Sequence, residues 1–84
     1  MNQLDIEEIV KEVVAAQLAI DKDEITPETV LSDDFGADSL DLIEICLGIE
    51  ERVNQEIPDE KIYALGDKVT IRDIVRITAE VVRG

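Results

Sequence analysis

The residue with the most accessible chemistry is Ser39, which stands between Asp38 and Leu40 just after a glycine-containing segment. An aspartate in that position is typical of a helix N-cap, whose carboxylate accepts free backbone N–H groups of the first turn. Ser39 would then take the first helical position with an uncommitted hydroxyl. A phosphate ester on that hydroxyl would meet the positive end of the helix dipole. Taken alone, an Asp-Ser pair indicates only a cap.

Other candidate chemistry is weak. The sequence has no histidine and one cysteine, Cys46, which excludes a histidine base, the usual zinc spacings and an internal disulfide. Asp33 and Asp34 could suggest paired carboxylates for acid–base hydrolysis, but we expect them on an exposed loop rather than in an apolar pocket. We therefore predict no catalytic residue and no metal site, and we expect Cys46 to be a small buried hydrophobic residue.

The elements that position these residues are three segments whose apolar side chains recur at intervals of three and four. This spacing predicts amphipathic helices. We expect the first over roughly residues 3–20, the second from Asp38 or Ser39 to about Asn54, and the third after Thr70. The fold class is all-α, a small bundle of three main helices plus one short helix, with residues 1–84 forming a single domain. The predicted core stripes are Ile6, Ile9, Val10, Val13, Val14 and Leu18, then Leu42, Ile45, Cys46, Ile49 and Val53, then Ile71, Ile74, Val75, Thr78, Val81 and Val82.

The connections between these helices carry turn and cap signals. Residues 21–37 are expected to form a long ordered loop with one helical turn after Pro27. Pro58 should interrupt the chain before a short helix within residues 59–65. Thr70 has the sequence of an N-cap, because Asp73 stands at the third helical position. The loop before Ser39 is longer than usual, as functional loops tend to be.

Charge is the strongest compositional signal, with eight Lys and Arg against 21 Asp and Glu and a net charge of −13. Nucleic acid and anionic membranes are therefore unsuitable partners. Disorder is the alternative for so acidic a chain, but 45% of the residues are apolar and they recur periodically. The acidic N-terminal segment and the lack of an apolar run near the roughly 20 residues of a membrane span lead us to expect a cytoplasmic protein without membrane insertion.

The second predicted helix carries another apolar stripe, Leu40, Ile43 and Leu47, rotated away from its core stripe. A thin bundle cannot easily bury both stripes, so the second indicates a docking surface, or else it is partly covered by the long loop. Ten acids and one base fall within residues 33–60. The resulting negative electrostatic field would steer basic partners toward this segment. The alternative is that these charges form only a solvated face. The carboxylates around the stripe belong to Asp38, Asp41, Glu44, Glu50 and Glu51.

The wider sequence around Ser39 resembles the acyl carrier protein signature in order and spacing. The matching segments are Asp34-Phe35-Gly36-Ala37-Asp38-Ser39-Leu40-Asp41, Ile43-Glu44, Ile49-Glu50-Glu51 and Ile57-Pro58-Asp59-Glu60. The resemblance is strong over residues 31–60 and looser on either side. It implies an acyl-carrier-protein-like bundle in which Ser39 receives 4′-phosphopantetheine from coenzyme A and the arm holds an acyl chain as a thioester.

The resemblance also implies a monomeric carrier, not an enzyme, that serves fatty acid biosynthesis or a related dissociated polyketide or specialised lipid pathway. Its implied partners are a phosphopantetheinyl transferase (holo-carrier synthase) and acyl synthases, reductases and transferases with basic docking patches. Two alternatives remain open, a carrier of an activated amino acid such as D-alanine and an unmodified acidic docking protein. The implied docking residues are Leu40, Asp41, Ile43, Glu44, Leu47, Glu50 and Glu51.

Gly48 departs from the alanine that these carriers usually have inside the second helix. Glycine there costs about 0.5–1 kcal/mol of helix stability. We hypothesise that it creates space under the helix, either for a bulky acyl group or for another side chain. The segment 61–69 also resembles a lengthened version of the family pattern, so the cargo is not fixed by the resemblance.

Overall fold

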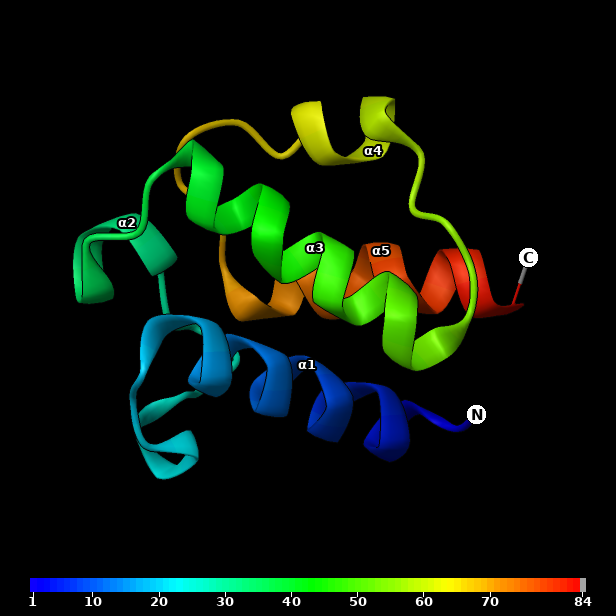
Figure 1. The fold of residues 1–84 in the computed structure, drawn as a ribbon, viewed down its shortest axis with the longest axis horizontal. Helices are drawn as coiled ribbons and strands as arrows, with labels where there is room; N and C mark the ends of the chain where they lie inside the picture. Colours follow the sequence, from blue (N-terminus) through cyan, green and yellow to red (C-terminus); the bar gives the residue numbers. More distant parts are fainter. Residues whose placement is uncertain (84) are drawn as a thin grey trace.

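A computed structural model describes residues 1–83, which form three long helices joined by two short helices and a 3-10 turn (Figure 1). The predicted all-α fold with three main helices is confirmed. The elements in chain order are α1 (Gln3–Leu18), η1 (Lys22–Glu24), α2 (Leu31–Phe35), α3 (Ser39–Val53), α4 (Asp59–Tyr63) and α5 (Ile71–Arg83).

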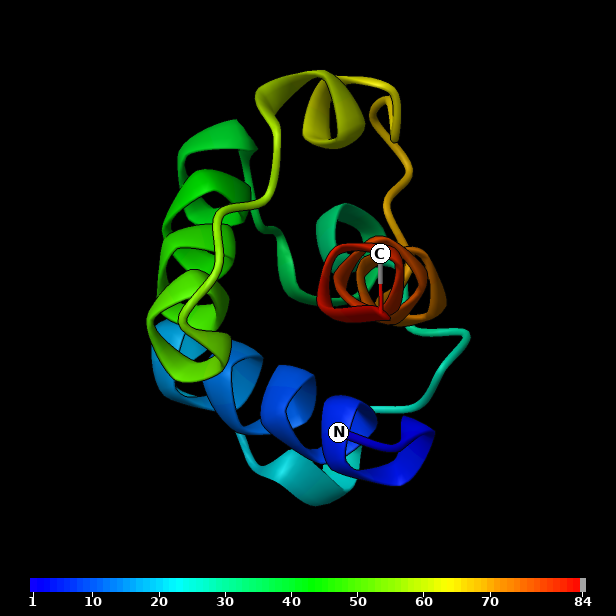
Figure 2. The ribbon, with the colours of Figure 1, turned by 90° about the vertical axis from the view of Figure 1, so that its right-hand side faces the viewer.

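The three long helices surround one core of aliphatic side chains. Viewed from the side, α1, α3, α4 and α5 form a ring, with α4 bridging the gap between α3 and α5 (Figure 2). Neither the one phenylalanine nor the one tyrosine is buried, so β-branched and other aliphatic residues fill the interior. The largest fully buried residues are Ile6, Val10, Val14, Ile45, Ile49, Ile71, Ile74 and Ile77.

α1 follows its predicted stripe but ends earlier than expected. The Asn2 side chain caps the start by accepting a hydrogen bond from the Asp5 amide at 2.9 Å. The helix stops at Leu18 because Ala19 adopts a left-handed conformation with φ of 56°. Ile9, Val13 and Leu18 are only partly buried, whereas the other predicted core residues of α1 are fully enclosed.

The helical turn expected after Pro27 is present as α2, but it does not follow Pro27 directly, and the 3-10 turn η1 precedes Pro27 as a second helical element. Pro27 and Glu28 make a tight turn, closed by the Thr29 amide donating to the Thr26 carbonyl at 3.1 Å. α2 begins only at Leu31, and the amide of the preceding residue, Val30, donates to the Asp34 carboxylate at 2.8 Å. Leu31 is buried, and the loop is therefore anchored at that residue.

Tertiary contacts hold the start of α2 against the start of α5. Val30 and Thr70 form an isolated antiparallel bridge, and the Leu31 amide donates to the Val69 carbonyl at 3.0 Å. The Ile71 amide returns a bond to the Thr29 carbonyl at 3.1 Å. The loop that precedes Ser39 is thus tied to a segment about forty residues later in the chain.

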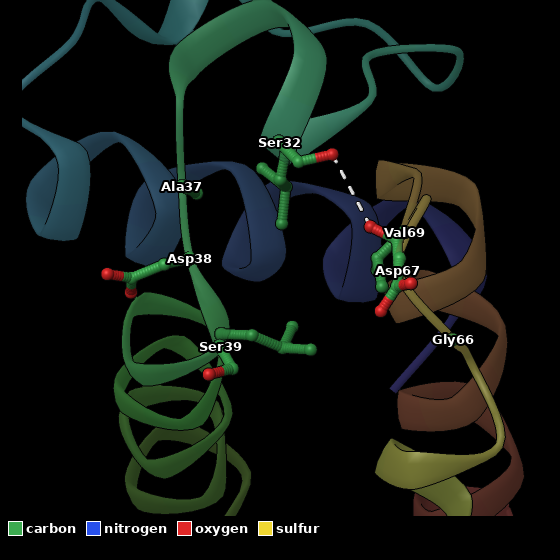
Figure 3. Close-up of a pocket in the computed structure, with 9 residues that line it drawn as sticks. Ser32, Ala37, Asp38, Ser39, Gly66, Asp67 and Val69 are labelled. Atoms are coloured by element: carbon green, nitrogen blue, oxygen red, sulfur yellow. Dashed lines mark hydrogen bonds between the residues drawn. The ribbon is translucent and has the colours of Figure 1, made fainter.

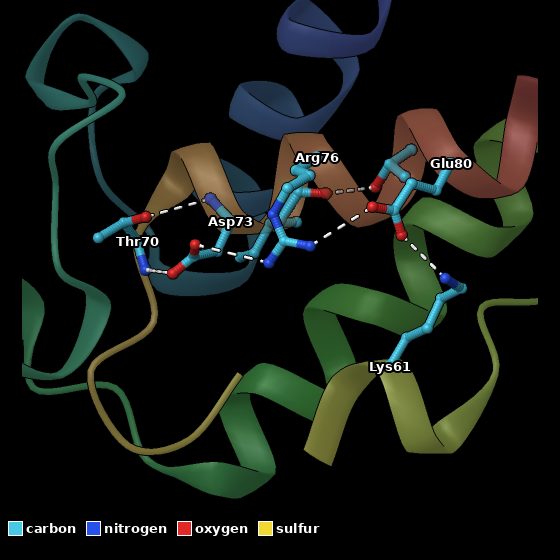
Figure 4. A network of polar contacts seen from close by, with 7 residues as sticks. Lys61, Thr70, Asp73, Arg76 and Glu80 are labelled. Atoms are coloured by element: carbon cyan, nitrogen blue, oxygen red, sulfur yellow. Dashed lines mark hydrogen bonds and ion pairs between the residues drawn. The ribbon is translucent and has the colours of Figure 1, made fainter. Parts of the chain in front are cut away.

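The capping box predicted for the last helix is present. Thr70 Oγ1 accepts from the Asp73 amide and the Asp73 carboxylate accepts from the Thr70 amide, both at 3.1 Å (Figure 4). The buried face of α5 is wider than its predicted stripe, because Ile77 and Ala79 are also buried. Val81 and Val82, at its end, are only partly buried.

Gly48 brings α3 into close contact with α1. A Cβ atom added to Gly48 would lie 2.8 Å from Val13 Cγ1, well inside van der Waals distance. The space created by the missing side chain is therefore filled by Val13, which agrees with the second of the two interpretations given for this glycine. A bulky cargo has no room at this point of the core.

Candidate functional site

The first turn of α3 is held by a reciprocal cap between two aspartates. Asp38 Oδ1 accepts from the Asp41 amide at 3.0 Å, and Asp41 Oδ2 accepts from the Asp38 amide at 3.1 Å. The helix starts at Ser39 as a result, with Asp38 as its N-cap in extended conformation. The left-handed Gly36, with φ of 66°, ends α2 two residues earlier and directs the chain into this cap.

Ser39 takes the first helical position and is exposed to solvent. Among the residues that the structure describes, its hydroxyl has no hydrogen-bond partner, because Asp38 takes the capping role. The Leu42 amide already donates to the Asp38 carbonyl, which leaves the amides of Ser39 and Leu40 as the remaining donors of the first turn. The hydroxyl is therefore available to a reagent from solvent and lies next to two unpaired amides.

A cavity of about 340 Å³ opens beside Ser39 (Figure 3). One wall comes from the start of α3, and the other from α2 and the segment before α5. The Ser32 hydroxyl donates to the Asp67 carbonyl at 3.4 Å, and the Lys68 ammonium pairs with the Asp33 carboxylate at 2.5 Å, so polar contacts join the two parts of the second wall. The apolar side chains that line the cavity are those of Leu31, Ala37, Leu42 and Val69.

Sequence reasoning did not find this cavity. Ser32, Gly66, Asp67 and Val69 reach it only because the segment before α5 packs against α2. The turn signal at Gly66 was visible in the sequence, but nothing local indicated that the turn would face Ser39.

The second apolar stripe of α3 is exposed. Leu40, Ile43 and Leu47 have exposed fractions of 60%, 43% and 55%, so all three side chains reach solvent. The stripe is therefore open to a partner, as the docking interpretation requires. The stripe runs along the helix that begins at Ser39, and a protein bound to it would approach the serine.

The predicted acidic residues around the stripe differ in how free their carboxylates are. Asp41 belongs to the cap, Glu44 accepts a hydrogen bond from the Gln17 side chain, and Glu50 accepts from the Ile57 amide at 2.6 Å. Glu51 is exposed, and no hydrogen bond to its side chain is found in the described part of the chain. Part of the acidic fringe is thus fixed in place by the fold.

Cys46 lies on the core side of α3 and is buried, as expected. Burial, with a smaller contribution from the nearby Glu50 carboxylate, raises the pKa of its thiol from 9.0 to about 11. The thiol is therefore protonated near neutral pH and is a poor nucleophile.

Residues 1–83 contain no group of three or more histidine, cysteine, aspartate or glutamate side chains arranged to hold a metal ion. Over the same residues, no helix combines the length and the apolar character needed to cross a membrane.

Comparison with known proteins gives consistent matches. The sequence family described as "Phosphopantetheine attachment site" matches residues 8–77. The chain is 46% identical over 70 residues to the acyl carrier protein of Clostridium perfringens, which covers 83% of this chain and 88% of that protein. It is 41% identical over 75 residues to the acyl carrier protein of Thermosynechococcus vestitus, covering 89% of each chain.

Proposed function

Because this chain belongs to the acyl carrier protein family, whose members bind phosphopantetheine and are carriers rather than enzymes, we propose that Ser39 is the residue to which 4′-phosphopantetheine is attached. The observation that carries this proposal is the division of roles at the start of α3. Asp38 caps the helix, so the adjacent hydroxyl is exposed and uncommitted. A serine that capped its own helix would have to give up that bond before it could react.

The attachment is a phosphoryl transfer from coenzyme A. A bond forms between Ser39 Oγ and the phosphorus of the 4′-phosphate, and the bond from that phosphorus to the adenosine bisphosphate breaks. The serine proton would pass to a base on the transferase, since the described residues include no histidine and the neighbouring Asp38 and Asp41 carboxylates bond to backbone amides. The remaining first-turn amides, those of Ser39 and Leu40, support the phosphodiester charge.

When bound, the group supplies a terminal thiol that holds an acyl chain as a thioester. The protein itself then provides an anchor at Ser39, a surface for partner enzymes and an apolar cavity beside the anchor. Leu31, Leu42 and Val69 form part of that cavity and suit an apolar segment of the arm or its cargo. This arrangement supports our proposal that the protein is a carrier in fatty acid biosynthesis or a related dissociated pathway. We further propose that it acts in the cytoplasm as a single domain.

The proposed partners are a phosphopantetheinyl transferase and acyl synthases, reductases and transferases. The exposed stripe of Leu40, Ile43 and Leu47 offers them apolar contact, and the flanking acids favour enzymes with basic patches. Carboxylates such as Glu50, which a backbone bond already orients, can bind a cation without further ordering.

Intact-mass analysis tests the attachment site. The protein is incubated with coenzyme A and a phosphopantetheinyl transferase, as wild type, Ser39→Ala and Ser32→Ala. We expect the mass of one phosphopantetheine group on the wild type and on Ser32→Ala, and no addition on Ser39→Ala. Ser32 is the matched control because its hydroxyl lines the same cavity. Addition to Ser39→Ala, or none to the wild type, would contradict the proposal.

A further inference from the structure

A second groove, of about 240 Å³, lies between α3 and the short helix α4, away from the cavity beside Ser39. Its floor includes the partly exposed Ile43 and Leu47 and the buried Cys46, and its α4 wall includes Ile62 and Tyr63. The groove therefore continues the apolar stripe of α3 onto a second helix. This extension was not visible in the sequence, where the docking stripe was confined to α3.

Tyr63 is the most exposed large side chain of this groove, with an exposed fraction of 74%. It is the only tyrosine in the chain, and tyrosine is a residue type enriched at the energetic centres of protein interfaces. α4 runs back from the C-terminal end of α3 toward the first turn of α3 (Figure 1), and Tyr63 is the last residue of α4. A protein that reaches Ser39 along α3 would therefore also meet this aromatic ring.

The groove is lined by two carboxylates, those of Glu50 and Asp59, and by no lysine or arginine of the described chain. The cations nearest in sequence are paired elsewhere. Lys61 Nζ lies 2.8 Å from Glu80 on α5 (Figure 4), and Arg52 pairs with Glu12 on α1 at 2.6 Å. The groove thus combines negative charge, apolar walls and an exposed aromatic ring, with no cation of its own.

We propose that this groove receives an arginine side chain from the enzyme that loads Ser39, an inference that rests on the proposed function. The aliphatic stem of arginine matches the apolar floor at Ile43 and Leu47, and its planar guanidinium can both pair with carboxylates and stack on Tyr63. Lysine would satisfy the charge but not the stacking geometry. The Glu50 carboxylate is already oriented by the Ile57 amide, which reduces the ordering needed on binding.

The test compares loading kinetics of five proteins: wild type, Tyr63→Ala, Tyr63→Phe, Asp59→Asn and the control Leu4→Ala. Leu4 is a matched exposed apolar residue, 75% exposed on α1. We expect kcat/KM for loading by a phosphopantetheinyl transferase to fall by roughly threefold to tenfold in Tyr63→Ala and in Asp59→Asn. Tyr63→Phe keeps the ring and should stay within about twofold of wild type, and Leu4→Ala should be unchanged. Thermal melts establish that each variant is folded.

A double-mutant cycle identifies the arginine. Replacing the interacting arginine of the transferase by lysine should slow loading of the wild type but have little further effect on Tyr63→Ala. Wild-type kinetics in Tyr63→Ala, or no arginine coupled to Tyr63, would overturn the inference. Loss of loading that accompanies dissociation of a Tyr63-dependent dimer, seen by sedimentation, would also overturn it, because a second copy would then fill the groove.

The inference and the proposed function fail in different ways. If the wild type is not loaded at Ser39, the attachment proposal fails. Binding of Ser39→Ala protein to the transferase, measured by titration calorimetry, still tests the groove, because no chemistry is needed. Equal dissociation constants for Ser39→Ala with and without Tyr63→Ala would then contradict the arginine site.

Discussion

Val13 on α1 fills the place of the side chain that Gly48 on α3 lacks, so that a Cβ at position 48 would lie 2.8 Å from Val13 Cγ1. The β-branched valine is stiff about χ1 and partly enclosed, so it has little freedom to move aside. The pair fixes how closely the two helices approach, and it makes Gly48 a packing requirement rather than a weak point of the helix.

We expect Gly48→Ala to destabilise the protein. Alanine improves helix propensity by about 0.5–1 kcal/mol, but overpacking against Val13 costs about 1–3 kcal/mol. Urea denaturation should show a net loss of roughly 1 kcal/mol. Adding Val13→Ala to the variant should make the Gly48→Ala change neutral or stabilising. A stability gain from Gly48→Ala alone would contradict the close contact.

Asp38→Ala should lower the free energy of unfolding by about 1 kcal/mol, because the N-cap of α3 is lost. Asp38→Asn is the matched control, since its amide oxygen can accept the same bond from the Asp41 amide and asparagine is an equally good N-cap. Both values come from chemical denaturation at neutral pH. Equal destabilisation by the two substitutions would show that the carboxylate charge, and not the cap, stabilises the helix start.

The Cys46 thiol should resist modification in the native state. Its pKa is raised by burial to about 11, so at pH 8 it should react with a thiol reagent far more slowly than the unfolded chain does. Reaction in native buffer and in urea, followed by absorbance, gives the two rates. Rapid stoichiometric labelling without denaturant would contradict the burial of Cys46.

The same raised pKa predicts a loss of stability in alkali. The unfolded thiol releases its proton near its ordinary value of 9.0, whereas the folded thiol keeps it until about 11. Between these values the folded state holds the extra proton, so the free energy of unfolding falls as pH rises. Cys46→Ala removes this contribution, and its stability should depend less steeply on pH above 9. Parallel pH profiles for the two proteins would refute the prediction.

Glu80 should titrate below its ordinary range. The hydrogen bond and charge of Lys61, with a smaller contribution from Arg76, lower the pKa of Glu80 from 4.5. Its contribution to stability is therefore present above pH 4.5 and lost as pH falls through the folded pKa. Carboxyl titration by NMR should show the pKa of Glu80 rising toward 4.5 in Lys61→Met. An unchanged pKa in that variant would show that Lys61 does not pair with Glu80 in solution.

Local sequence signals were sufficient where a structure depends on neighbouring residues. The caps at Asp38 and Thr70 each involve a partner three residues away, and both helices begin where predicted. The apolar side chains spaced at intervals of three and four likewise predicted most of the core residues. The start of α2 could not be predicted in this way, because it depends on Val30 meeting Thr70 and on Leu31 meeting Val69 across the fold.

In the site, too, local features could be predicted from the sequence and features that depend on long-range packing could not. The exposed stripe of α3 could be recognised from residue spacing, but the orientation of its acids could not. Glu50 was expected simply on the fringe, whereas the Ile57 amide holds one of its oxygens. Tyr63 was not singled out, since a lone tyrosine after a proline-led turn carries no pattern, and only the packing of α4 beside α3 places it in a groove.

The reciprocal aspartates that start α3 also affect how selectively Ser39 meets small molecules. Free nucleotides and other phosphate-rich metabolites carry several negative charges, and they would approach a hydroxyl flanked by Asp38 and Asp41 on a chain of net charge −13. Repulsion at that range slows unassisted encounters. The same charges favour the approach of a positively charged protein to the start of α3.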